Sequence, residues 1–411
     1  MRVLVWGVNY HPEQVGIAPY NTALCEYLTR EGHEVEMVAA FPYYPMWEKA
    51  KVDAARFFRT DTVRGVRVHR CWHYVPRKPA GLGRMVHEAT FVATSLMRAL
   101  TLKRADVMVV VSPPLLLGAA AWLVGRLKRT PHVLHIQDLQ PDAAVGLGML
   151  EHPPFIALLR RLERFNYRVA ARVSAISEGM LEILRGRGIE RLVYFPNWIA
   201  TRSGEVQRGL FRAAWGIGRD EFVLLYSGNI GMKQGLDLIV KAAARVKEVR
   251  LIICGDGAGR PGLEALIASS GAENVILLPL QSEEDYVRMM ADADVCVISQ
   301  RAGGGAAFFP SKLLSSVALG KPVLVVADGD GELARVVREE GLGFWVAPDN
   351  IEAVSEVIRG LRGSRARLEE CGRNGESFAA RFEEERVLGE FEKVLEELAT
   401  GERSRATAGV V

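Results

Sequence analysis

The chain has 411 residues, of which 49% are hydrophobic and 25% charged; this is an ordinary globular composition, and the length favours two domains over a single core. Its five cysteines lie far apart, which excludes a disulfide framework and a clustered zinc site and predicts a reducing compartment. The net charge of +3 divides into +9 for residues 1–200 and −6 for the rest, so an anionic partner is expected for the first half, whose basic residues are too dispersed to predict nucleic-acid binding.

Targeting and membrane signals are the next feature. The N-terminus runs directly into a strand pattern without the basic leader and apolar core of a secretory signal. No uninterrupted apolar stretch reaches the roughly 20 residues of a spanning helix. The sequence therefore predicts a cytoplasmic protein.

Short apolar runs alternate with helical stretches throughout the chain, which is typical of βαβ units and a mostly parallel sheet. In the first half the predicted strands are 2–8, 34–40, 66–70, 106–111, 132–136, 172–176 and 192–195. A polar stretch over 197–220 contains no strand pattern and is predicted to be a linker between domains. In the second half the predicted strands are 222–226, 251–254, 275–278, 295–298, 323–326 and 343–346, with helices such as 236–246 and 283–291 between them.

These patterns predict an α/β protein of two doubly wound, Rossmann-like domains that face each other across a cleft. The predicted boundaries are 1–200 and 201–382, followed by a helix over 383–400 and a tail over 401–411. The helix carries one apolar stripe and is predicted to pack back across the hinge; the stripe consists of Val387, Phe391, Val394, Leu395 and Leu398. Ligands of such sheets bind outside the carboxyl ends of the strands, so the loops there are the candidate site.

Two kinds of loop carry candidate chemistry. After the first strand, Gly16 precedes a helix predicted to begin at Pro19, which suits backbone binding of an anion, although a plain turn is the alternative. The second half opens with a glycine-rich loop over 227–236 that contains Lys233, and a later helix begins near Ser311 and Lys312. Two such loops predict a clamp for a diphosphate. No G-x-G-x-x-G follows the first strand, so a dehydrogenase is disfavoured.

These motifs, with Phe41-Pro42-Tyr43-Tyr44-Pro45, Leu134-His135-Ile136-Gln137-Asp138, Phe195-Pro196-Asn197-Trp198 and Pro310-Ser311-Lys312-Leu313, make the chain similar to the retaining glycosyltransferases of family 4, which have the GT-B fold. Within that family it most resembles the colanic acid type of exopolysaccharide glycosyltransferase. The resemblance spans about residues 1–330.

The resemblance implies roles for individual residues. For the donor it implies binding by Gly16, Ile17, Gly228, Asn229, Lys233, Gln234, Leu280, Gln281, Ser311, Lys312, Leu313 and Ser315. For catalysis it implies His135 near the reacting sugar and Asp138 as acceptor base, with packing and loop capping as their structural alternatives. For the acceptor it implies Asn9, Tyr10, His11, Tyr43 and Tyr44.

Two departures from the family pattern concern the donor. Asn229 and Gln234 stand where most relatives have arginine and lysine, so Lys233 would supply the charge. The two family glutamates fall on Ala307 and Ser315, so the usual carboxylate contact to the donor ribose is lost or replaced. The nucleotide and the sugar are therefore left open.

A membrane surface is the expected partner of the basic half. Residues 76–104 combine six basic side chains with apolar ones at helical spacing, and 155–172 repeats the pattern with Arg160, Arg161, Arg164 and Arg168. Such helices lie at a lipid interface, although the apolar stripe also fits packing on the sheet. We expect peripheral association with the inner face of the cell membrane.

The implied reaction moves a sugar from a GDP- or UDP-linked donor to a lipid-linked saccharide in exopolysaccharide or O-antigen assembly. No D-x-D pair is expected in a site loop, so no metal and no cofactor are predicted; helix N-termini with Lys233 and Lys312 would stabilise the leaving diphosphate. Front-face transfer with retention is favoured because no carboxylate is placed as a nucleophile. A sugar-nucleotide epimerase and a non-catalytic sugar-nucleotide binding module remain as alternatives.

Overall fold

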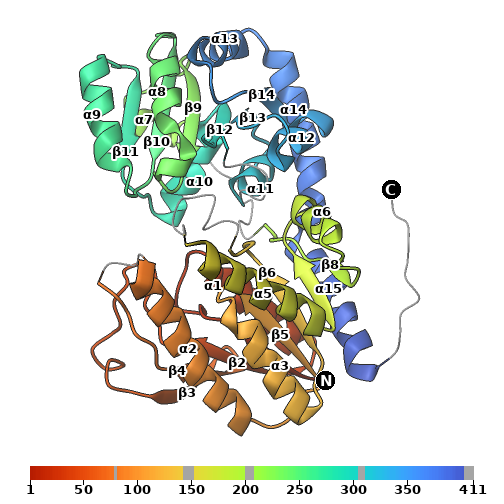
Figure 1. The fold of residues 1–411 in the computed structure, drawn as a ribbon. Helices are drawn as coiled ribbons and strands as arrows, with labels where there is room; N and C mark the ends of the chain where they lie inside the picture. Colours follow the sequence, from red (N-terminus) through yellow and green to blue (C-terminus); the bar gives the residue numbers. More distant parts are fainter. Residues whose placement is uncertain (78–80, 142–151, 200–207, 304–310, 402–411) are drawn as a thin grey trace. The chain divides into compact units, whose positions relative to one another are not determined.

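A computed structural model describes residues 1–77, 81–141, 152–199, 208–303 and 311–401. The chain folds as two units (Figure 1): Met1–Asn197 together with the chain from Glu384 onwards form the first, and Trp198–Glu383 form the second. These divisions lie within three residues of the predicted boundaries at 200 and 382. The C-terminal helix is thus part of the N-terminal unit.

An eight-stranded sheet forms the centre of the N-terminal unit, in the order β3-β4-β2-β1-β5-β6-β7-β8. Its strands are β1 (Arg2–Trp6), β2 (Glu34–Ala40), β3 (Phe58–Val63), β4 (Val66–Cys71), β5 (Val107–Ser112), β6 (His132–Ile136), β7 (Arg172–Ala175) and β8 (Leu192–Tyr194). All neighbours pair in parallel except β3, which pairs antiparallel with β4. The central strands β1, β2 and β5 are almost completely buried, as expected for a parallel sheet covered on both faces.

The connections between parallel strands in this unit are right-handed. Helices therefore lie on one face of the sheet where the strand order runs in one direction, and on the opposite face where it runs in the other. They are α1 (Ala18–Arg30), α2 (Gly81–Thr101), α3 (Leu116–Lys128), α5 (Pro153–Val169), α6 (Glu178–Gly186) and α15 (Glu384–Thr400). Along one face, α3 packs between α2 and α5, and on the other α1 packs against α15. Pro19 is the second residue of α1, which begins one residue earlier than predicted.

A six-stranded, wholly parallel sheet forms the centre of the C-terminal unit, in the order β11-β10-β9-β12-β13-β14. Its strands are β9 (Phe222–Ser227), β10 (Val249–Cys254), β11 (Val275–Leu278), β12 (Val295–Ser299), β13 (Val323–Val326) and β14 (Gly343–Val346). Two separate hydrophobic clusters lie on its two faces, one built around Leu313 and Phe378 and the other around Ile239 and Ile358. This is the doubly wound arrangement that the alternating pattern predicts.

The helices of the C-terminal unit connect successive strands and then close the unit. They are α7 (Leu210–Ala214), α8 (Leu236–Ala243), α9 (Arg260–Ser270), α10 (Glu283–Asp292), α11 (Ser311–Val317), α12 (Glu332–Glu339), α13 (Ile351–Leu361) and α14 (Arg365–Ala379), with short 3₁₀ turns at Met232–Gln234 and Ala380–Phe382. The short helix α7 lies within the predicted linker and packs against α10, so part of that stretch belongs to the C-terminal unit.

Helix α15 returns to the N-terminal unit through apolar and charged contacts. Leu388, Phe391 and Leu395 are buried, and the Phe391 ring stacks on Phe195 with 3.7 Å between ring centroids. Glu392 accepts hydrogen bonds from the Tyr27 hydroxyl at 2.9 Å and pairs with His33 at 2.7 Å. The predicted stripe is confirmed at its centre, while Val394 and Leu398 are only partly buried.

Candidate active site

Both sheets have a switch point, where strand order reverses and the loops after two neighbouring strands diverge. In the N-terminal unit this point lies between β1 and β5, and in the C-terminal unit it lies between β9 and β12. Ligands of doubly wound sheets bind at the carboxyl edge beside this point. The glycine-rich loop after β9 and the loop before α1 both start there, each at the carboxyl edge of its own sheet.

In the C-terminal unit, the ammonium group of Lys312 lies over the glycine-rich loop. A Cβ atom at Gly228 would collide with the Lys312 side chain, and Gly228 has a φ of +133°, which side chains rarely adopt. Glycine at this position therefore permits the lysine to cross the loop. This brings together two residues that the sequence predicted from separate motifs.

Tyr226, at the end of β9, fixes the position of that lysine. Lys312 Nζ donates a hydrogen bond of 2.5 Å to the Tyr226 hydroxyl and lies 4.0 Å from its ring centroid. The phenol in turn donates to the backbone carbonyl of Asn229 at 2.6 Å. Burial lowers the pKa of Lys312 to about 8, so the group remains mostly an ammonium at neutral pH. The sequence analysis missed Tyr226, because nothing in a strand sequence marks which side chain reaches the neighbouring loop.

The other residues of the glycine-rich loop divide into exposed and anchored ones. Lys233 and Asn229 are exposed, and Lys233 accepts a backbone hydrogen bond of 2.7 Å from Arg301. Gln234 accepts a hydrogen bond from the Gly231 amide at 3.1 Å, so its side chain stabilises the turn itself. Among the cationic side chains predicted here, Lys233 is the one that extends into solvent and Lys312 the one that is half-buried.

Arg301 connects the loop after β12 to the glycine-rich loop. Its guanidinium donates to the Met232 carbonyl at 3.1 Å and pairs with Asp237, on the first turn of α8, at 2.8 Å. Arg301 stands just before a glycine-rich run, and the sequence analysis gave it no role. Gly304, Gly305 and Ala307, which continue that run, lie outside the described residues.

An acidic pair that the sequence analysis overlooked stands at the same edge. Asp328 and Asp330 have D-x-D spacing and follow β13, so the expectation that no such pair stands in a site loop was wrong. Asp328 accepts a hydrogen bond of 2.8 Å from the Gly303 amide, and this bond holds the loop after β13 to the loop after β12. Asp330 is exposed.

The remaining predicted donor residues lie on the loop after β11 and on α11. Leu280 is 70% exposed, and the Gln281 side chain donates to the Pro279 carbonyl at 2.9 Å. Ser311 is the first residue of α11, whereas Leu313 is completely buried in the core. Ser315 donates to the Lys312 carbonyl at 3.2 Å. Backbone groups at Leu280 and Ser311 thus remain candidates for contact with a ligand, and the Leu313 side chain is a packing residue.

In the N-terminal unit, a buried carboxylate joins two loops at the carboxyl edge. Glu13 accepts hydrogen bonds from the backbone amides of Tyr43 and Tyr44 at 2.9 and 2.8 Å through one oxygen. Its other oxygen accepts from the Asn9 amide group at 2.8 Å. With only 8% of Glu13 exposed, this network fixes the loop after β1 against the loop after β2. The sequence analysis gave Glu13 no role.

The predicted acceptor residues differ in what they expose. Tyr10 is completely buried, with Arg70 over its ring, so its side chain belongs to the core. Tyr43 is 7% exposed, and its hydroxyl lies 3.1 Å from His87 Nε2. Tyr44 is 36% exposed, and His11 is partly exposed while its amide donates to Thr22 at 3.0 Å. Among the predicted acceptor residues, Tyr44 and His11 are thus the ones whose rings reach solvent.

His135, at the end of β6, is held by hydrogen bonds on both ring nitrogens. Its Nε2 accepts from the Gln137 amide group at 2.8 Å, so Nδ1 carries the proton and donates to Ser174 at 3.0 Å. Gln137 also bonds to Asn197 at 3.0 Å. Burial lowers the pKa of His135 to about 3, which keeps the imidazole neutral. His135 is therefore a neutral polar group at the edge near neutral pH.

Asp138 and the start of α1 complete this edge. Asp138 is exposed and follows the His135 strand end by three residues. Gly16 has a φ of +67° and Ile17 is the N-cap of α1, so the first amides of that helix follow a glycine turn. A Cβ atom at Gly16 would lie 3.6 Å from the Tyr44 ring, which places Tyr44 beside the turn.

Of the two basic helices predicted as membrane-facing, α2 is partly committed to internal contacts. On α2, Arg84 pairs with Glu88 at 3.3 Å and Arg98 donates to Thr60 at 2.7 Å, while Phe91 and Val92 are buried. The apolar side chains that α2 exposes are Leu82, Met85, Val86, Met97 and Leu100. Within the part of the chain that the structure describes, none of the helices has the length and apolar content needed to cross a bilayer.

One group of side chains in the described ranges has the spacing of a metal site. Ligand atoms of His33, Glu392 and Glu396 lie within 4.8 Å of one another. His33 directly precedes β2, so this group lies at the amino edge of the sheet, opposite the candidate site. Within this group, the contact of 2.7 Å between His33 and Glu392 holds α15 to the N-terminal unit.

Comparisons with known proteins agree with this architecture. The family model "Glycosyl transferase 4-like domain" matches residues 15–198, and "Glycosyl transferases group 1" matches residues 207–378. The chain is 32% identical over 373 residues to the protein named colanic acid biosynthesis glycosyl transferase WcaI of Escherichia coli strain K12, covering 87% of this chain and 91% of that protein.

Solved structures show the same fold. Sucrose-phosphate synthase of Thermosynechococcus elongatus superimposes with a TM-score of 0.75 at 18% identity, covering 97% of this chain and 99% of that one. HepE of Anabaena in complex with UDP superimposes with a TM-score of 0.69 at 16% identity, covering 97% and 100%. The two parallel-sheet units are those of the GT-B fold, and the chain belongs to the glycosyltransferase family.

Proposed function

We propose that this glycosyltransferase moves a sugar from a GDP- or UDP-linked donor to a lipid-linked saccharide, with retention at the anomeric carbon and without a metal ion, in the assembly of an exopolysaccharide or O-antigen. The position of Lys312 is the observation that carries the donor part of this proposal. Its ammonium lies over Gly228 and is oriented by the Tyr226 hydroxyl. The name of the relative WcaI, which refers to colanic acid biosynthesis, supports the product class.

The donor diphosphate binds at the carboxyl edge of the C-terminal unit. Backbone amides of the glycine-rich loop and the start of α11 provide hydrogen bonds, and Lys312 and Lys233 provide positive charge. In transfer, the bond between the anomeric carbon and the diphosphate oxygen breaks, and negative charge grows on the departing nucleotide. A pre-oriented ammonium in a half-buried position stabilises that charge more than one in bulk water.

The acceptor binds at the carboxyl edge of the N-terminal unit, where Glu13 fixes the loops that carry Tyr44 and His11. The acceptor hydroxyl attacks the same face from which the diphosphate departs, and its proton passes to the departing phosphate or to Asp138. His135 hydrogen-bonds a hydroxyl of the reacting sugar as a neutral group after exchanging its bond to Gln137. Tyr10 contributes through packing.

The membrane is the surface on which a lipid-linked acceptor is found, so the protein associates with it peripherally from the cytoplasmic side. The exposed apolar side chains of α2 and the exposed arginines of α5 support this part of the proposal. Neither helix needs to unfold or leave the sheet to reach a lipid interface.

A panel of nucleotide sugars tests the proposal in two steps. Ligands that stabilise the fold raise the midpoint of thermal unfolding, and we expect GDP- or UDP-sugars to do so in the presence of EDTA. The stabilising donor is then incubated with a polyprenyl diphosphate-linked saccharide, and the product anomer is assigned by NMR. An inverted anomer would refute retention, and release of an epimerised sugar nucleotide without acceptor would refute transfer.

A further inference from the structure

Five aromatic rings form a cluster at the carboxyl edge of the N-terminal sheet. Tyr43, Tyr44 and Trp47 come from the turn after β2, His73 comes from the segment after β4, and His87 comes from α2. Trp47 has no role in the function proposed above, although it belongs to the same turn as the predicted acceptor residues Tyr43 and Tyr44.

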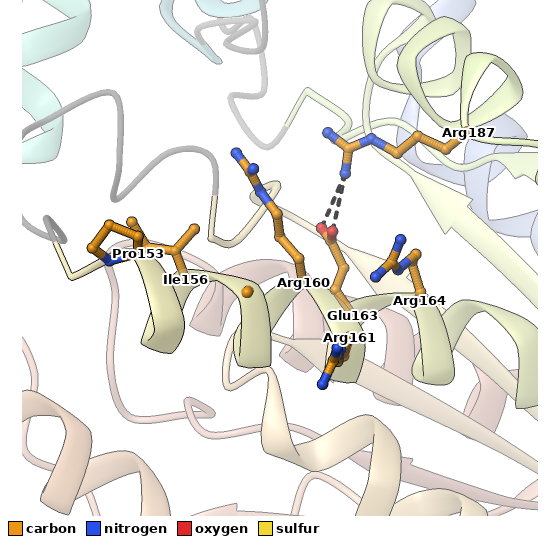
Figure 2. A pocket seen from close by; sticks show the side chains of 8 residues that line it. Pro153, Ile156, Arg160, Arg161, Glu163, Arg164 and Arg187 are labelled. Atoms are coloured by element: carbon orange, nitrogen blue, oxygen red, sulfur yellow. Dashed lines mark hydrogen bonds and ion pairs between the residues drawn. The ribbon is translucent and has the colours of Figure 1, made fainter.

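A separate cavity of the same unit lies along α5 (Figure 2). Its carboxylate, Glu163, accepts hydrogen bonds from Arg187 at 3.1 and 3.2 Å and from the Tyr167 hydroxyl at 2.7 Å. This ion pair holds α5 to the residue that directly follows α6, which is a structural role. The aromatic cluster differs, because two of its rings are partly open to solvent.

The buried part of the cluster is fixed by hydrogen bonds. His87 Nδ1 lies 2.7 Å from the Tyr74 carbonyl, so this nitrogen carries the proton and donates it. The Nε2 atom of His87 therefore accepts from the Tyr43 hydroxyl, 3.1 Å away. His73 is completely buried, and its ring centroid lies 4.8 Å from that of Tyr43 and 5.0 Å from that of His87. Tyr43, His73 and His87 thus form a fixed base.

Trp47 and Tyr44 pack on this base and reach solvent. Tyr44 is 36% exposed, and Trp47 is half-buried. The centroid of the Trp47 ring lies 5.3 Å from that of Tyr43, 5.2 Å from that of His87 and 6.4 Å from that of Tyr44. The interplanar angles of these pairs lie between 58° and 80°. Contacts with three rings therefore hold the indole in one orientation.

The backbone at Trp47 is unusual for such a large side chain. Its φ is +53°, in the left-handed region that bulky residues rarely adopt. Strained conformations of this kind persist where surrounding contacts enforce them, and they gather at ligand sites. Here the Glu48 amide donates to the Tyr43 carbonyl at 3.2 Å and closes the turn. A glycine would adopt this conformation freely but would offer no ring.

The chemistry of this surface fits a sugar ring. A pyranose carries hydroxyl groups around its rim and C–H groups on its faces, and polarised C–H groups are attracted to the negative face of an aromatic ring. A lipid anchor needs side chains that project from the surface, as the 83% exposed Met46 does, whereas Trp47 is packed against three rings. A Cβ atom at Gly16 would lie 3.6 Å from the Tyr44 ring, so the cluster adjoins the turn before α1.

From this geometry we infer that Trp47 and Tyr44 form a platform on which a pyranose ring of the acceptor stacks. Trp47 is then a residue that determines acceptor specificity, since its fixed indole selects sugars with a flat C–H face. The inference rests on the proposed transfer to a saccharide acceptor. It assigns recognition of the sugar part of that acceptor to named side chains.

Fluorine NMR of the full chain labelled with 5-fluorotryptophan tests the platform directly, with UDP present at saturation. The Trp47 signal is the one that is missing in Trp47→Phe. We expect methyl pyranosides of glucose, galactose, mannose or fucose to shift this signal in a saturable way, and sorbitol, a polyol without a ring, to leave it in place. Tyr44→Ala should weaken the response. The signal of Trp122, a 39% exposed tryptophan on α3, is the control and should not move.

The same NMR experiment has two outcomes that overturn the inference. One is a Trp47 signal that none of the four pyranosides shifts, or that moves no more than the Trp122 signal. The other is a Trp47 signal that responds to phosphatidylglycerol vesicles and to none of the sugars, which would show a lipid anchor instead.

Steady-state transfer assays test the role of Trp47 in the reaction. Trp47→Ala should raise the KM for the acceptor about tenfold and leave kcat and the dissociation constant of UDP close to their wild-type values. Trp47→Phe keeps a smaller ring and should fall between wild type and Trp47→Ala. Trp122→Ala removes an exposed tryptophan far along the sequence from the cluster and should behave like wild type.

Failure of the inference differs from failure of the proposed function. If wild type transfers sugar and Trp47→Ala has the same acceptor KM, the inference fails and the proposed function stands. If wild type binds UDP but transfers no sugar to any saccharide, the proposed function fails, and the assignment of Trp47 to the acceptor fails with it, whatever the NMR signal shows about sugar binding.

Discussion

Lys312 combines a fixed position with a lowered pKa, so donor binding should depend on pH in a defined direction. Because burial brings its pKa to about 8, the ammonium is present below that pH and is lost above it, whereas an exposed lysine would keep its charge to about 10.4. We expect the affinity for UDP to fall about tenfold per pH unit above pH 8. Titration calorimetry between pH 7 and 10 measures this.

Two variants at position 312 test whether Lys312 itself causes this pH dependence. Lys312→Arg stays charged and should bind UDP with no loss between pH 8 and 10. Lys312→Gln should bind roughly ten- to a hundredfold more weakly at pH 7 and show no dependence on pH in this range. An unchanged decline in the arginine variant would show that another group titrates.

Glu13 provides a second prediction at the scale of one residue. Glu13→Ala leaves the amides of Tyr43 and Tyr44 without their acceptor, at a cost of about 1–3 kcal/mol for each unsatisfied group. We expect a rise in the acceptor KM of tenfold or more in steady-state transfer assays, with an unchanged dissociation constant for UDP. Glu26→Ala, which removes a half-exposed partner of Arg64, is the matched control, and an equal effect of both variants would argue against a positioning role for Glu13.

Local sequence patterns predicted some of the candidate site residues and missed others. Lys312 and Gly228 belong to loop motifs that follow strands, and the structure brings them together. Tyr226 and Glu13 were missed because their partners lie on other segments, and no local pattern encodes a hydrogen bond between distant loops. Tyr10 follows a strand end, as site residues often do, and only the fold shows that its ring points into the core.

At the scale of elements, α15 is the segment whose contacts reach farthest along the sequence. Phe391 is 2% exposed and stacks on Phe195, so Phe391→Ala leaves a cavity and should cost about 3–5 kcal/mol. Urea unfolding measures the free energy. Lys393→Ala, on an exposed position of the same helix, should change it by less than about 0.5 kcal/mol.

The segments that lose protection in the Phe391→Ala protein give a second test of the contacts of α15. Hydrogen exchange should rise in α1 and β8 of the Phe391→Ala protein and remain unchanged in the C-terminal sheet, because α15 belongs to the N-terminal unit. Increased exchange in β9 and β10 alone would contradict this assignment.

Most strands were predicted from their apolar runs, several of them residue for residue, as for β2, β6 and β11. The exception is β3, which pairs antiparallel at the sheet edge and alternates exposed and half-exposed residues. An edge strand needs no continuous apolar run, so Phe58–Val63 gave no signal. Similarly, α7 is too short to show a helical period within the polar stretch predicted as a linker.

For the whole molecule, the uneven distribution of histidine predicts that acid weakens the two units differently. All eight histidines lie in the first 152 residues. Burial lowers the pKa values of His73, His132 and His135 to about 3, 4 and 3, below their ordinary value of 6.5. The folded N-terminal unit thus binds fewer protons than its unfolded chain, and its stability falls as the pH drops from about 6.5 towards 4, by about 1.4 kcal/mol per pH unit for each histidine.

Hydrogen exchange at pH 7 and 5, corrected for intrinsic rates, measures this difference. We expect a loss of protection across β1, β5 and β6 that exceeds any loss across β9 to β14. His73→Phe keeps a ring among Tyr43 and His87 and removes one titrating group, so it should reduce the pH dependence. An equal loss in both sheets would contradict the histidine account.

The central claim is that Lys312 and the loops of the C-terminal unit hold a nucleotide diphosphate sugar without a divalent ion. The decisive experiment compares the rates of sugar transfer by wild type, Lys312→Gln and Asp330→Asn, each in EDTA and in excess Mn²⁺. We expect equal turnover in both conditions for wild type and Asp330→Asn, and a large loss in Lys312→Gln. Turnover that disappears in EDTA, or that depends on Asp330 and not on Lys312, would contradict it.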